Sequence, residues 1–158
     1  MDLPESVSSL LRPLFSVLPP DQAMRRLVVL EAAPAGPVGA VERVVEEALD
    51  QFPSPLCSAL WLYVDELDRS HAIAQGMKNA TGSFWHGIMH RREGDFPNSH
   101  YWFNRVGDHP AMSQIDGYDA HGFIDAVELD AGVNQRELVA RQQAEWQALF
   151  AWCAQNPE

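Results

Sequence analysis

Proline and glycine residues cut this chain into segments of helical length, and within each segment the apolar residues recur at the spacing of an α-helix. The run from Val38 to Phe52 shows the pattern well, because glutamates occupy much of its opposite face. The next run, from Leu56 to Ala74, keeps the same rhythm and carries His71 on its apolar stripe. The pattern predicts two long helices here, with a turn at Pro34–Pro37 before the first.

Further segments of the chain fit helices by the same criterion. They cover residues 4–18, 84–92, 97–106, 118–130 and 133–154. Thr81 or Ser83 is the expected N-cap of the helix over residues 84–92. Leu27–Leu30 has the composition of a strand, but a single strand has nothing to pair with. We therefore expect an all-α fold, a helical bundle or orthogonal helix array with a loop-rich middle, in one domain over residues 1–158.

The charge of the chain is acidic and unevenly distributed. Its formal net charge of −11 is a poor match for nucleic acids or anionic membranes, so we expect neither as a partner. Residues 1–70, 71–110 and 111–158 carry formal charges of −6, +1 and −6, and the middle segment holds five of the six histidines. A small anionic or polar molecule is the expected ligand of this middle segment.

Cysteine usage and the chain start predict a cytoplasmic protein. Cys57 and Cys153 are each flanked by apolar residues and form no metal or redox motif, which is typical of small core residues in a reducing compartment. The first residues lack the basic and apolar stretches of a signal peptide, and no run reaches the length of a membrane span. The sequence leaves the oligomeric state open.

The segment from Phe84 to Glu93 has apolar residues on more than one face, which predicts a buried helix. At about 100° per residue, His86, His90 and Glu93 lie within roughly 60° of one another. Two imidazoles and a carboxylate on one face are a geometry with which a helix binds a divalent transition metal, with His71 or His121 as a third imidazole. His86, His90 and Glu93 are therefore the candidate catalytic residues.

Other interpretations of this helix stay open. His86 is followed by Gly87, so the glutamate that acts as general base in H-E-x-x-H metalloproteases is missing. His86 and His90 are equally compatible with hydrogen-bonded residues of the core, with His86 paired to Glu93 or to a backbone carbonyl. Asp68 stands three residues before His71, a spacing at which a carboxylate can orient an imidazole.

Aromatic and basic side chains surround the histidines in the sequence and are candidates for substrate binding. The positive charges of the middle segment are Lys78, Arg91, Arg92 and Arg105. Arginine binds carboxylate or phosphate with two parallel hydrogen bonds, so a pocket walled by Trp85, Tyr101 and Trp102 with arginines at its rim is chemically coherent. The alternative is that Arg92 pairs with Glu93 or Asp95 and fixes the loop.

The stretch from Ala80 to Phe103, which contains Trp-His-Gly-Ile-Met-His-Arg-Arg-Glu-Gly-Asp-Phe-Pro-Asn-Ser, resembles the signature of an uncharacterised protein family of bacteria and fungi. The similarity extends to Arg105, Gly107, His109 and Pro110. The resemblance implies that function resides in this segment, between His71 and His109. It implies no substrate, cofactor or catalytic role.

Three functions are compatible with these residues. The first is an enzyme that uses the His/Glu cluster, with or without a metal, on a small anionic or polar substrate. The second is a non-catalytic module that binds a small ligand with the same aromatic and arginine residues. The third is a structural or interaction protein in which the polar segment only fixes the packing. The first is our working hypothesis.

Overall fold

The computed structural model describes residues 1–48 and 52–157, and its regular structure in these ranges is entirely helical. The elements in chain order are α1 (Glu5–Val17), α2 (Ala35–Glu47), α3 (Ser54–Tyr63), α4 (Leu67–Ala74), α5 (Ala80–Arg92), α6 (Phe96–Val106), the 3-10 helix η1 (Pro110–Gln114), α7 (Ala120–Asp130) and α8 (Arg136–Gln155). No strand occurs among the described residues, so the predicted all-α fold is confirmed. None of the described helices is long and apolar enough to cross a membrane.

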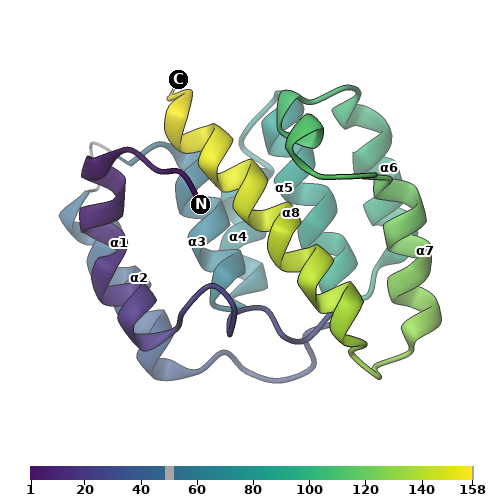
Figure 1. Ribbon diagram of the computed structural model, residues 1–158, viewed down its shortest axis with the longest axis horizontal. Helices are drawn as coiled ribbons and strands as arrows, with labels where there is room; N and C mark the ends of the chain where they lie inside the picture. Colours follow the sequence, from purple (N-terminus) through teal and green to yellow (C-terminus); the bar gives the residue numbers. More distant parts are fainter. Residues whose placement is uncertain (49–51, 158) are drawn as a thin grey trace.

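The helix α5 lies in the middle of the arrangement and packs against α3, α4 and α6. Figure 1 shows α1 and α2 at one side and α6 and α7 at the other, with α8 running diagonally across the front. Every residue from Thr81 to Arg92 is buried, as the mixed apolar pattern of this segment predicts. Aromatic residues fill the core beside α5, where the Trp146 ring lies 4.8 Å from Tyr63 and 4.6 Å from Phe150 between centroids.

Some helix ends differ from the sequence-based predictions. The expected helix over residues 56–74 is broken between α3 and α4, where Asp65 adopts a positive φ of 66°. Its carboxylate lies 2.7 Å from Arg92 of α5, and this ion pair fixes the break. The helix α2 begins at Ala35, because Pro37 stands in the first turn, where its missing N–H costs no helical hydrogen bond. It ends at Glu47, so the expected continuation over 49–51 lies outside the described residues.

The segment between α1 and α2 crosses the lower side of the molecule in Figure 1 and has no regular structure. Leu27 packs there with Phe123, Val127 and Leu138, which form a second, smaller apolar cluster. The Val29 N–H donates to the Arg92 carbonyl over 2.8 Å. Leu27–Leu30 is therefore held against the end of α5 without forming a strand.

Candidate metal centre

Three histidines meet where α4 packs against α5. His86 and His90 stand one turn apart on α5, and their rings are stacked with centroids 4.8 Å apart. His71 of α4 approaches both, at 4.7 Å from His86 and 5.4 Å from His90. One nitrogen of each of the three residues lies within 4.8 Å of the others, a grouping that could hold a metal ion. The alternative third imidazole, His121, lies elsewhere and pairs with His100.

Burial keeps His86 in the form that binds metals. His86 and His90 are almost fully buried, with 3% and 7% of their surface exposed, whereas His71 is half-buried. Burial, together with the positive charges that His90, His71 and Lys78 can carry, lowers the pKa of His86 to about 4. His86 is therefore a neutral imidazole at physiological pH, with a lone pair available for coordination.

The close packing of α6 on α5 positions the aromatic neighbour of the cluster. The Ser99 hydroxyl donates to the Gly87 carbonyl over 2.7 Å, and a Cβ atom on Gly87 would lie 2.7 Å from the Phe103 ring. Only a glycine allows this approach without a shift of Phe103. It brings the Trp102 indole flat onto the His86 imidazole, with centroids 3.8 Å apart and planes at 13°.

Glu93 contacts one histidine of the cluster from the side. Its carboxylate lies 2.5 Å from Nδ1 of His90, so that Nδ1–H donates to Glu93 and Nε2 is the nitrogen left for coordination. We predicted Glu93 as a metal ligand together with His86 and His90. In the alternative interpretation it was a hydrogen-bond partner of His86. The structure instead pairs Glu93 with His90 and leaves it outside the three-histidine group.

A second group, His90, Glu93 and Asp95, also has ligand atoms within 4.8 Å of one another. Asp95 is the N-cap of α6 and accepts two hydrogen bonds from Asn98, at 3.2 Å and 2.9 Å. The side-chain bond from Asn98 is the main cause of the lowered pKa of Asp95. Glu93 is exposed, Asp95 is half-buried, and both carboxylates already accept hydrogen bonds within the protein, so the three-histidine group is the better metal site.

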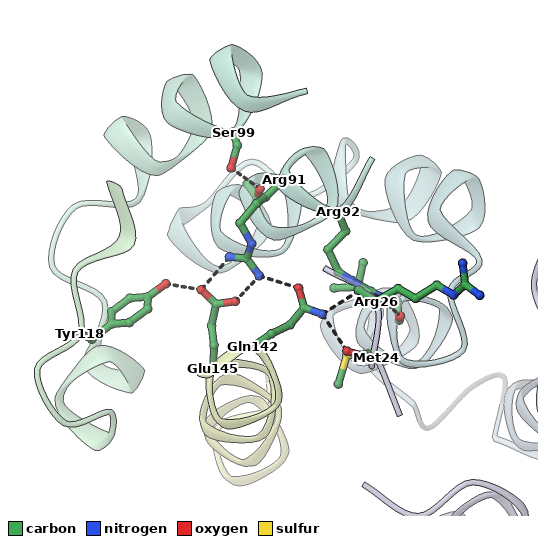
Figure 2. Close-up of polar contacts among 10 residues, drawn as sticks. Met24, Arg26, Arg91, Arg92, Ser99, Tyr118, Gln142 and Glu145 are labelled. Carbon is green, nitrogen blue, oxygen red and sulfur yellow. Dashed lines mark hydrogen bonds and ion pairs between the residues drawn. The ribbon is translucent and has the colours of Figure 1, made fainter. Parts of the chain in front are cut away.

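The two arginines that follow His90 point into the protein interior. Figure 2 shows Arg91 facing Glu145 of α8, and its guanidinium binds both carboxylate oxygens at 3.0 Å and 2.7 Å. Tyr118 donates to the same carboxylate over 2.5 Å, and Gln142 accepts from Arg91 over 3.3 Å. Both arginines have no exposed surface, and Arg92 binds Asp65. We therefore assign Arg91 and Arg92 a structural role in place of the predicted role in substrate binding.

The other predicted substrate-binding residues are divided between the interior and the surface. Trp85 has no exposed surface and packs near Trp146, so it is a core residue. Trp102 and Arg105 both line a pocket of about 500 Å³ at the amino end of α5. Tyr101 is exposed and lies edge-on to Trp102.

Two features of this region were not predicted from the sequence: a ligand-binding role for Lys78 and the position at which α5 begins. The connection between α4 and α5 contributes Lys78 to the pocket wall, and α5 itself begins earlier than expected, with Asn79 as its N-cap in place of Thr81 or Ser83. Asn79 is a strong N-capping residue type, and its position before a buried helix was the available signal.

No family model, curated protein or solved structure matches the chain.

Proposed function

We propose that this protein is an enzyme that binds one divalent transition-metal ion between His71, His86 and His90 and acts on a small anionic or polar substrate. The observation that carries the proposal is the meeting of three imidazoles from two helices, with one nitrogen of each within 4.8 Å of the others. Imidazole nitrogen is a preferred ligand of zinc, iron, nickel and copper ions.

The number of ligands favours a catalytic ion over a structural one. Structural zinc sites normally close the tetrahedron with four protein ligands, whereas catalytic sites use three and leave a position for water or substrate. When bound, such an ion polarises substrate oxygens and lowers the pKa of a coordinated water. Glu93 supports the site by fixing the tautomer and the ring orientation of His90.

The surroundings of the three histidines match this role. Trp102 covers His86 and limits its rotation, and it also forms part of the neighbouring pocket. Arg105 lines the same pocket, so of the three predicted arginines it is the one that we retain as a substrate-binding residue. His71 is the most exposed of the three ligands and marks the side from which solvent reaches the cluster.

The His90–Glu93 hydrogen bond favours a second candidate function, metal-free acid–base catalysis. A carboxylate that accepts from Nδ1 strengthens Nε2 of the same imidazole as a base. The two functions exclude each other at His90. Proton transfer needs a free Nε2, whereas metal binding uses Nε2 as the ligand atom.

Cobalt(II) substitution tests the proposal, since its visible spectrum reports ligand geometry. We expect the full chain, purified without a histidine tag, to bind one Co²⁺ with the intense bands of a tetrahedral site and to change spectrum when azide is added. His86→Ala and His90→Ala should abolish the bands, and His100→Ala, which removes an imidazole outside the cluster, should preserve them. Bands unaffected by azide would identify a closed, structural site, and the absence of bands would favour metal-free chemistry.

A further inference from the structure

The pocket at the amino end of α5 is lined by residues from three segments of the chain. The connection from α4 contributes Gln75 and Lys78, α5 contributes Ser83, and α6 contributes Trp102 and Arg105. Its volume of about 500 Å³ is in the range of pockets that bind small organic molecules. The pocket therefore has the size for a metabolite and not for a macromolecule.

The charge of the pocket wall is opposite to the charge of the chain. The wall contains the cationic side chains of Lys78 and Arg105 and no carboxylate, in a protein of formal net charge −11. Arg91 and Arg92 are neutralised by carboxylates, whereas neither pocket cation forms an ion pair with any residue in 1–48 or 52–157. Two unpaired positive charges in one concave site attract a dianion.

The pocket is a neighbour of the three histidines. Trp102 lines the pocket and stacks on His86. Ser83, in the pocket wall, stands three residues before His86 and therefore on the same side of α5. Lys78 is close enough to His86 for its charge to act on that imidazole. The pocket therefore adjoins the histidine cluster through Trp102.

We propose that this pocket binds the phosphate group of a small phosphomonoester, with Lys78 and Arg105 holding the phosphate oxygens. Two cations balance the charge of a phosphate dianion, and the guanidinium fork matches two of its oxygens while the lysine ammonium takes a third. The first turn of the 13-residue helix α5 adds its positive dipole end at Ala80 in the pocket wall. The organic part of the molecule lies along Trp102 and reaches the histidines, and only this last step rests on the proposed function.

Calorimetric titration of the full chain with inorganic phosphate and with phenyl phosphate tests the proposal, first after removal of metals by chelation. We expect both probes to bind the metal-free protein. Lys78→Ala and Arg105→Ala should each raise Kd about tenfold, and the double variant should abolish measurable binding. Both side chains are exposed, so these variants keep the packing of the core. The matched control is Arg43→Ala with Arg136→Ala, which removes the same charge from other exposed positions.

The outcomes separate this proposal from the metal site. Phosphate binding that needs metal and His86, and is unchanged in the Lys78/Arg105 double variant, would place the phosphate on the metal and overturn the proposal. Binding that is lost in the double variant supports it, even if the chain takes up no metal. An equal loss of binding in the control variant, or equally tight binding of acetate, would show a nonspecific charge effect and also overturn it.

Discussion

The Nδ1 atom of His90 lies 2.5 Å from a carboxylate oxygen of Glu93, three residues further along the chain. This contact occupies Nδ1 and leaves Nε2 as the nitrogen that His90 can offer to the group with His71 and His86. A carboxylate in this position makes the imidazole a better ligand without touching the metal.

Replacement of Glu93 therefore tests its orienting role. We expect Glu93→Ala to weaken Co²⁺ or Zn²⁺ binding about 10- to 100-fold, with little loss of stability because the side chain is partly exposed. The measurement is a competition titration against a chromophoric chelator. Glu128→Ala, which removes the same charge from the exposed surface of α7, is the control. Equal affinities for the two variants would show that Glu93 does not support the site.

The buried ion pair between Arg91 and Glu145 is expected to be costly to break from one side. Arg91→Ala leaves the Glu145 carboxylate in the interior without its charged partner and with the neutral Tyr118 hydroxyl still bonded to it, so we expect a loss of about 3–5 kcal/mol in the free energy of unfolding. Urea unfolding at neutral pH measures it. Arg141→Ala removes an exposed arginine that pairs with Glu137, and should cost less than about 1 kcal/mol. Similar losses for both variants would contradict the structural role of Arg91.

Gly87 is expected to tolerate no side chain. A Cβ atom there would lie 2.7 Å from the Phe103 ring, so Gly87→Ala should separate α5 from α6 and lower the free energy of unfolding by about 1–3 kcal/mol. The same change should weaken metal binding, because Trp102 is carried on α6. Gly36→Ala is the control, since no atom lies within 4 Å of its added Cβ and alanine favours the helix. A Gly87→Ala protein as stable as the Gly36→Ala protein would be evidence against close helix packing.

Acid should destabilise the metal-free protein over a defined range. The Ala111 N–H donates to Nδ1 of His109, which leaves Nε2–H to donate to Thr81. Burial lowers the pKa of His109 and lowers that of His86 to about 4. Below the ordinary histidine pKa of about 6.5, the unfolded chain takes up protons that the folded chain does not. The contribution of these neutral imidazoles is therefore complete above that pH and is lost as the pH falls toward 4.

Urea unfolding between pH 8 and pH 4 measures this loss. The slope of the free energy of unfolding against pH should be smaller in His109→Asn than in the unchanged chain, once the two are normalised at pH 8. A slope that is equal or larger would show that His109 does not carry the predicted proton linkage.

Local pattern was sufficient to predict the part of the site that lies on one helix. Apolar residues on more than one face predicted that α5 is buried, and the α-helical period alone brings His86 and His90 to the same side. The apolar stripe that carries His71 likewise placed this residue toward the core, although the long helix assumed for it is broken.

The rest of the site depends on contacts between residues far apart in the chain. Asp65, in the break between α3 and α4, binds Arg92, 27 positions later, and Arg91 binds Glu145, 54 positions later. An arginine beside a histidine cluster suggests substrate binding when its buried partner is unknown, and helix periodicity does not reveal that partner. The pocket at Lys78 and Arg105 required the packing of α6 against the connection before α5.

Metal stoichiometry of the full chain is the most direct test of the metal centre formed by His71, His86 and His90. The protein, without a histidine tag, is dialysed against Zn²⁺ and its metal content is measured by mass spectrometry. We expect one ion per chain in the unchanged protein and in His100→Ala, and less than a tenth of an ion, roughly, in each of His71→Ala, His86→Ala and His90→Ala. Uptake that is absent from the unchanged chain, or that persists in all three variants, would contradict the account.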